Sequence, residues 1–182
     1  MRKYTEEELI TIIDERLENW IFADGNHACD RHMNIDIKEL KDRVNNGGSK
    51  YSSTFIDNNG GDDIIRELRY RLVRNITNIM HWVNDSNNES LCLKSYLPYN
   101  VKGFTYSLPD PSKTDDIYEV KNYIIVLSKK YANPFYMVTA YPMDYFYQFN
   151  YKCVNIPKSQ EQSVGTYSRH TTKGHCTLCA RY

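Results

Sequence analysis

The segment "IYEVKNYIIVLSKKYANPFYMVTAYPM", residues 117–143, decides the fold class of this chain. Its two runs, 117–128 and 135–143, are rich in β-branched and aromatic residues and are separated by turn residues, which is typical of strands. The runs "LCLKSYL" (91–97) and "GFTYSL" (103–108) have the same texture. The second half of the chain is therefore predicted to form a mainly antiparallel β-sheet.

Three stretches in the first half have the pattern of amphipathic helices. Thr5 and Glu8 form a capping box before an apolar stripe, which predicts a helix that ends near "ADGN". Asp36 is a suitable N-cap for a second helix over about 36–45, and a third stripe predicts one long helix over about 62–84. Because helices come first and strands afterwards, we expect an α+β fold with the helices packed on the sheet.

Length, charge and cysteine content narrow the class of protein. We expect an N-terminal helix over 1–24, a main domain over 25–150 and a polar, mobile C-terminal extension over 151–182. The 23 basic and 23 acidic residues cancel, which disfavours binding of nucleic acid through a global positive field. Scattered cysteines favour reduced thiols in a cytosol over a secreted disulfide framework. Without a bilayer-length apolar stretch or a signal peptide, a soluble protein is expected.

Four side chains are candidates for catalysis. His32 precedes the second helix and Arg43 projects from it, so the two are expected to border one cleft. The two-residue alternation of the last strand places Thr139 and Tyr141 on one face. The two predicted faces are Phe135, Met137, Thr139 and Tyr141 against Tyr136, Val138 and Ala140.

An imidazole, a guanidinium and two hydroxyls in one cleft can cleave RNA without a metal. The imidazole takes the proton of the ribose 2′-OH, the guanidinium and the threonine hydroxyl stabilise charge on the phosphorane, and the phenol or a second imidazole orients or protonates the leaving oxygen. Each residue also has an ordinary structural interpretation, because a histidine near a helix start, an arginine on a helix and a Thr-x-Tyr pair in a strand are common.

The order of several short motifs carries a family resemblance. "HxxxRH…LxxRV" is followed by "STF", a long predicted helix ending in "NIMHW", and "YIIVL…FYMVTAYP". Over roughly residues 25–144 this order resembles the RNase A-like toxin domain found at the C-termini of bacterial contact-dependent growth inhibition proteins and other polymorphic toxins. The resemblance implies an α+β ribonuclease that needs no cofactor, metal or disulfide, cleaves RNA through a 2′,3′-cyclic phosphate, and is neutralised by a cognate immunity protein.

The resemblance also implies which residues act. Its catalytic positions match His32, Arg43, Thr139 and Tyr141, and residues in the same motifs are expected to contact substrate, namely His27, Arg31 and Thr54. Such a domain acts in the cytoplasm, or in the cytoplasm of a target cell into which it is delivered. The chain departs from the family pattern by starting at its own methionine without a visible delivery segment, and by carrying some forty residues after "TAYP" that could cover the cleft.

Two other classes of function stay open at this point. The motif "RHTTKGHCTLC" suggests a small zinc site, with ligands among His170, His175, Cys176 and Cys179 together with Cys153 or Cys29. A non-catalytic RNA- or protein-binding module on the same fold is the second alternative. It would use arginines of the third predicted helix, Arg66, Arg69, Arg71 and Arg74, to bind phosphates.

Overall fold

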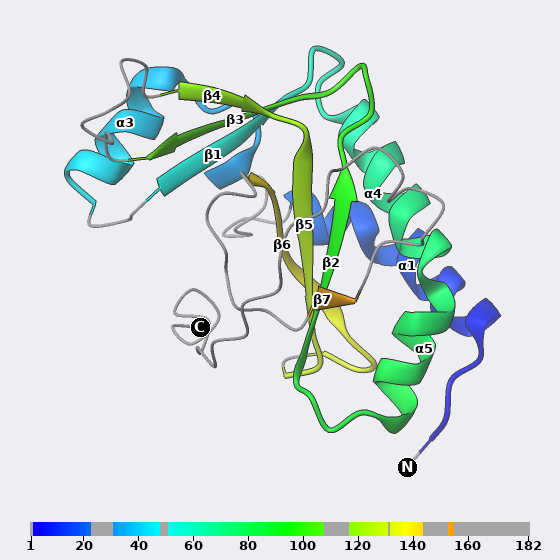
Figure 1. The fold of residues 1–182 in the computed structure, drawn as a ribbon. Helices are drawn as coiled ribbons and strands as arrows, with labels where there is room; N and C mark the ends of the chain where they lie inside the picture. Colours follow the sequence, from blue (N-terminus) through cyan, green and yellow to red (C-terminus); the bar gives the residue numbers. More distant parts are fainter. Residues whose placement is uncertain are drawn as a thin grey trace, which may run out of the picture.

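The computed structural model describes residues 2–22, 31–47, 51–107, 117–130 and 132–143, and the backbone of 153–154. These residues form the predicted α+β fold (Figure 1). The helices are α1 (Glu6–Phe22), α3 (Ile37–Asn45), α4 (Asp62–Arg74) and α5 (Ile76–Asp85). The strands are β1 (Tyr51–Ile56), β2 (Ser90–Tyr96), β3 (Lys102–Ser107), β4 (Ile117–Val120), β5 (Asn122–Ser128), β6 (Tyr136–Met143) and β7 (Cys153–Val154).

The described strands form two sheets, where the sequence pattern predicted one. A three-stranded sheet has the order β1-β3-β4, and a four-stranded sheet has the order β6-β5-β2-β7, in which only β7 is parallel to its neighbour. The run 117–128 was predicted as one strand, but it breaks at Lys121 and its halves pair in different sheets. Where the sheets meet, a Cβ at Gly103 would lie 2.6 Å from the Leu97 side chain and 2.8 Å from Pro142, so only glycine fits this close approach.

The helix starts follow the predicted capping. The Thr5 backbone N–H donates to the Glu8 carboxylate at 2.9 Å, and the Glu8 N–H donates to the Thr5 hydroxyl at 3.2 Å, which is a reciprocal capping box. The Asp36 side chain accepts from the N–H of Lys38 at the start of α3. Both predictions are confirmed.

The prediction of one long helix over 62–84 is wrong in one respect, because this segment forms two helices, α4 and α5, that meet at Asn75. This residue has φ −106° and ψ 15°, outside the helical range, and its side-chain amide donates to the carbonyl of Arg71 at 2.8 Å. Asparagine competes with the helical hydrogen-bond ladder in this way, and the apolar period alone gives no sign of it.

The two faces of the four-stranded sheet differ. One face, here called the helix face, packs on α1, α4 and α5 (Figure 1). The opposite face, here called the Tyr141 face, carries a smaller apolar cluster. The helix face contributes Leu91, Leu93, Tyr123, Ile125, Leu127, Met137 and Ala140 to the main core. The apolar cluster on the Tyr141 face consists of Cys92, Ile124, Val126, Tyr141 and Met143, with Tyr51 and Val138 packed against it.

A β-bulge in β6 corrects the predicted faces of that strand. Thr139 pairs with Val126 and Met137 pairs with Leu127, so Val138 is an extra residue between them. Thr139 and Tyr141 share the Tyr141 face and Ala140 lies on the helix face, as predicted. Because the bulge reverses the alternation, Met137 lies in the helix-side core with Phe135, and Val138 packs on the Tyr141 face; these three were predicted wrongly.

The three-stranded sheet packs on α3 through a separate small cluster that contains Leu40, Val44 and Tyr106. No helix within the described ranges is long and apolar enough to cross a membrane. Helix α1 contributes Leu9 and Ile13 to the same core as α4 and α5, so the N-terminal helix is part of the folded body that carries the sheet.

Candidate active site

The segment just after His32 runs beside β1. Met33 forms a parallel bridge with Phe55, and the N–H of Asn34 donates to the Phe55 carbonyl at 2.8 Å. Asn34 has a left-handed backbone (φ 50°), a conformation that asparagine tolerates, and its amide exchanges two hydrogen bonds with the backbone of Asp57. These contacts fix His32 above the middle of β1.

The His32 ring is oriented by this strand. Its Nδ1 lies 3.0 Å from the carbonyl oxygen of Ser53 and 3.4 Å from the Ser53 hydroxyl. A carbonyl oxygen only accepts hydrogen bonds, so Nδ1 carries the proton, and a neutral imidazole then presents its lone pair at Nε2. The half-buried His32 is therefore held in the tautomer that a general base needs.

Tyr141 lies directly against this imidazole. The ring centroids of His32 and Tyr141 are 5.2 Å apart with the planes tilted by 34°, and the Tyr51 ring lies 6.4 Å beyond Tyr141. Tyr141 is nearly buried, at 5% exposure. Strand β6, which is distant in the sequence, is thus in contact with the short segment that precedes α3.

Thr139 lies on the same face of β6, two residues from Tyr141 and about 7 Å along the strand. Its hydroxyl oxygen is buried and has no hydrogen-bond partner among the residues that the structure describes. Buried polar groups in proteins are nearly always paired, so a buried hydroxyl without such a partner, two residues from Tyr141, is a candidate ligand contact.

The Arg43 guanidinium reaches the same region from α3. One terminal nitrogen donates to the carbonyl of Arg31 at 2.7 Å, and the other donates to the Glu39 carboxylate at 2.5 Å. Arg31 directly precedes His32, so this planar fork lies beside the residue that carries the imidazole. The structure thus brings His32, Arg43 and Tyr141 into one region, with Thr139 on the face that Tyr141 shares.

The three residues predicted to contact substrate, Thr54, Arg31 and His27, have different environments. Thr54 is 1% exposed, and its hydroxyl accepts from the N–H of Ile35 and donates to the Phe55 carbonyl, so it holds the segment after His32 against β1. Arg31 is exposed and contributes its carbonyl to Arg43. His27 lies outside the described residues.

Sequence reasoning missed two residues that hold this region together. Glu39 binds Arg43 one turn earlier on α3, a pair that the i, i+4 spacing signals. The Ser53 carbonyl positions His32, but a backbone acceptor leaves no mark in the sequence beyond its place in the motif "STF".

The proposed zinc ligands lie outside the residues whose side chains are described. Within those residues, no group of three or more His, Cys, Asp or Glu side chains is arranged to hold a metal. The arginines of the binding-module alternative lie on α4, in the helix layer (Figure 1). Three of them pair with acids, because Arg66 contacts Asp63, Arg69 contacts Asp14 and Arg71 contacts Glu67.

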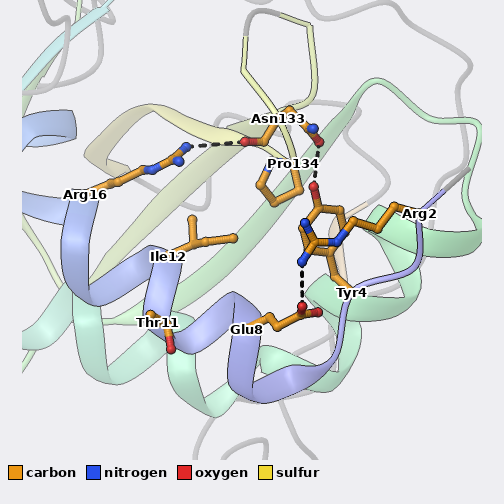
Figure 2. Close-up of a pocket in the computed structure, with 8 residues that line it drawn as sticks. All are labelled: Arg2, Tyr4, Glu8, Thr11, Ile12, Arg16, Asn133 and Pro134. Carbon is orange, nitrogen blue, oxygen red and sulfur yellow. Dashed lines mark hydrogen bonds and ion pairs between the residues drawn. The ribbon is translucent and has the colours of Figure 1, made fainter.

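A hollow of about 390 Å³ lies at the start of α1, in the helix layer (Figure 2). The Tyr4 hydroxyl donates to the Asn133 side chain at 2.9 Å, and Arg16 donates to the Asn133 carbonyl at 3.3 Å. Arg2 pairs with Glu8 at 2.6 Å beside them. These bonds attach the N-terminal segment to the β5–β6 connection, so the polar groups of the hollow have a structural task.

A match to one family profile and a similar fold are found among known proteins. The family profile described as "Bacterial CdiA-CT RNAse A domain" matches residues 26–142. A chain in the crystal structure of a CdiA-CT/CdiI complex from Y. kristensenii has a similar fold, with a TM-score of 0.52 and 21% identity over 63% of this chain and 96% of that chain. No curated protein matches the chain.

Proposed function

We propose that this chain, a member of the bacterial CdiA-CT RNase A domain family, is a ribonuclease in which the ribose 2′-OH attacks the adjacent phosphodiester. The observation that carries the proposal is the hydrogen bond from His32 Nδ1 to the Ser53 carbonyl, with Tyr141 stacked beside the ring. It leaves a lone pair on Nε2 of a half-buried imidazole, which contacts the Tyr141 ring and lies in the region that Arg43 reaches from α3.

His32 is the proposed general base. Nε2 takes the proton of the 2′-OH as the 2′ oxygen forms its bond to phosphorus, and the Ser53 carbonyl stabilises the imidazolium through Nδ1. The bond from phosphorus to the 5′ oxygen then breaks, and that oxygen takes up a proton. The products are a 2′,3′-cyclic phosphate and a 5′-hydroxyl.

Arg43 and Thr139 are the proposed stabilisers of the charge that develops on phosphorus-bound oxygens. The terminal nitrogens of Arg43 donate to the Arg31 carbonyl and the Glu39 carboxylate, so the guanidinium is held in place before the substrate arrives. Thr139 supplies a hydroxyl that has no hydrogen-bond partner among the described residues and can donate to an oxyanion. The Tyr141 phenol is the proposed group that orients or protonates the leaving oxygen.

We further propose that a cognate immunity protein neutralises this domain, and that the domain acts in the cytoplasm of a cell into which it is delivered. Family membership supports both parts of this proposal. The structurally similar chain from Y. kristensenii was crystallised in a complex with CdiI.

The direct test is incubation of the purified protein with total RNA in EDTA, followed by sequencing of the product ends. The proposal expects cleavage that leaves 2′,3′-cyclic phosphates and that is lost in His32→Ala. RNA binding without turnover would favour the non-catalytic module, and zinc in the purified protein together with activity lost in EDTA would contradict metal-independent cleavage.

A further inference from the structure

Besides Thr139, the Tyr141 face carries a second buried polar side chain, Asn122, at the first residue of β5. Asn122 is 9% exposed, and its Oδ1 has no hydrogen-bond partner among the described residues. Its neighbours along β5, Ile124 and Val126, belong to the Tyr141 face, and its partner across the strand pair is Met143, also of that face. Strand alternation therefore places the Asn122 amide on the Tyr141 face.

Asn122 stands close to the proposed catalytic groups. Tyr141 pairs directly with Ile124, so Asn122 is its diagonal neighbour on the adjacent strand, a position about 7–8 Å away that long side chains reach across. The same register places the half-buried Lys94 in the row of Tyr141, on the far side of Ile124. Polar groups thus surround Tyr141 on a face that is otherwise apolar.

An amide in this position lowers the stability of the free protein. A buried oxygen without a partner loses its hydration and gains no hydrogen bond in return, so folding alone gives no reason to place asparagine there. Leucine has nearly the same shape and would fill the site without that cost. The amide is explained if a ligand supplies the missing donor.

We infer that Asn122 reads the base of a nucleotide next to the cleaved bond, an inference that rests on the proposed ribonuclease function. The side chain offers an acceptor, Oδ1, beside a donor, Nδ2. This pair matches a base edge on which an amino group lies next to a ring nitrogen, as in adenine and cytosine. Unpaired bases of single-stranded RNA expose these edges, so the ligand is a single-stranded segment with an amino-bearing base at this site.

The test measures base preference in binding and in cleavage separately. Binding uses 2′-O-methyl hexanucleotides of A, C or U, which lack the attacking hydroxyl, in fluorescence anisotropy with the wild type and Asn122→Leu. A good base-edge contact gives about tenfold discrimination or more. The wild type is expected to prefer A or C over U by about that factor, and the variant is expected to bind all three within about threefold.

Cleavage of dinucleotides that vary in one base is expected to show the same loss of preference in kcat/KM, with the poorest wild-type substrate cleaved at a similar rate by both proteins. The thermal midpoint of Asn122→Leu is expected to be equal to or above that of the wild type. If Asn122→Leu does not fold, Asn122→Ala replaces it in both measurements.

Ser95→Ala is the matched control. Ser95 also has a buried side chain, but its position is opposite Tyr123 across the strand pair, so it lies on the helix face. Its removal is expected to leave the base preference unchanged. The inference would be overturned if the wild type and Asn122→Leu had equal base preferences, or if Asn122→Leu lost the same amount of affinity for the A, C and U oligonucleotides. Binding with a base preference that Asn122→Leu removes, but without cleavage by the wild type, would contradict the proposed ribonuclease and leave the base-reading site standing.

Discussion

The two faces of the four-stranded sheet use the same strands for opposite purposes. The helix face lies in a continuous apolar core, and the Tyr123 hydroxyl at this face donates to Glu67 of α4. The Tyr141 face has a small apolar cluster, and two of its polar side chains, Thr139 and Asn122, have an oxygen without a partner among the described residues. Consecutive residues of one strand thus serve stability and the proposed chemistry in turn.

This difference makes the two sets of residues separable by mutation. Substitutions on the helix face are expected to change the free energy of unfolding with little effect on RNA cleavage. Substitutions at and around the Tyr141 face are expected to change cleavage with little effect on unfolding. A protein in which both faces respond alike would have no distinct catalytic surface.

His32→Ala should give the largest effect, a loss of at least about a hundredfold in kcat/KM on RNA, the usual contribution of a positioned general base. The thermal midpoint should change little, because the ring is only half-buried. His81→Ala is the matched control, since His81 is exposed on α5 beside Asp85 in the helix layer. If His81→Ala loses as much activity as His32→Ala, His32 is not the base.

Arg43→Lys should lower kcat/KM by about tenfold or more although it keeps the charge. Two terminal nitrogens of the guanidinium bind Arg31 and Glu39 at once, and a lysine ammonium cannot reproduce that fork. Arg69→Lys provides the comparison, because Arg69 makes a similar two-bond contact with Asp14 in the helix layer. Full activity in Arg43→Lys would show that cleavage does not need the guanidinium of Arg43, and would leave Arg43 with a structural role only.

Thr139→Val and Tyr141→Phe each remove one hydroxyl with little change of shape, and at least one of them should lower kcat by about tenfold. RNA binding, measured with uncleavable oligonucleotides, should persist in both. Thr139→Val should unfold at the same temperature or higher, because its lost hydroxyl has no partner among the described residues. Ala140→Ser, which alters the helix face, should lower the thermal midpoint and leave kcat unchanged.

Tyr123→Phe should lower the free energy of unfolding by roughly 1–2 kcal/mol without altering cleavage, because the Tyr123 hydroxyl donates to the half-buried Glu67 carboxylate at 2.8 Å. Urea titration and RNA cleavage measure the two quantities.

The same variant should change the response to alkaline pH. Burial, with the nearby Glu67 charge, raises the pKa of Tyr123 well above its ordinary value of 10.0. Above that pH the unfolded state releases a proton that the folded state keeps, so stability falls as pH rises. In Tyr123→Phe this contribution is absent, and the decline above about pH 10 should be shallower. An equally steep decline would place the sensitive group elsewhere.

The smallest effect is expected from Arg66→Gln combined with Arg69→Gln. Both arginines pair with acids in the helix layer, so RNA cleavage and RNA affinity should stay within about twofold of the wild type. A large loss of affinity would revive the idea that α4 binds phosphates.

The sequence predicted the parts of this fold that depend on local patterns. The capping box at Thr5 and the Asp36 cap lie where expected, and the alternation in β6 correctly placed Thr139 and Tyr141 on one face. The pattern failed wherever a non-local contact or a backbone irregularity intervened. Asn75 breaks the long helix, Lys121 divides one predicted strand between two sheets, and Val138 adds a bulge.

The candidate site follows the same division. Side chains of the required chemical types were visible in the sequence, and the motif order selected His32 and Arg43 together with the strand residues. Neither the carbonyl that binds His32 nor the unused oxygens of Thr139 and Asn122 has a sequence signature, since both depend on what surrounds the atom in three dimensions.

The acceptor for His32 Nδ1 belongs to the main chain, and this matters for genetics. A carbonyl oxygen is present whichever amino acid occupies position 53, so no side-chain substitution deletes it. In a deep mutational scan, substitutions of Ser53 are expected to lower stability, because the residue is completely buried. The scan cannot show the effect of the Ser53 carbonyl on the imidazole proton, because every substitution keeps that carbonyl. A chain of this family can therefore carry another residue at this position and still keep the same tautomer, as long as β1 keeps its register against the segment that carries the histidine.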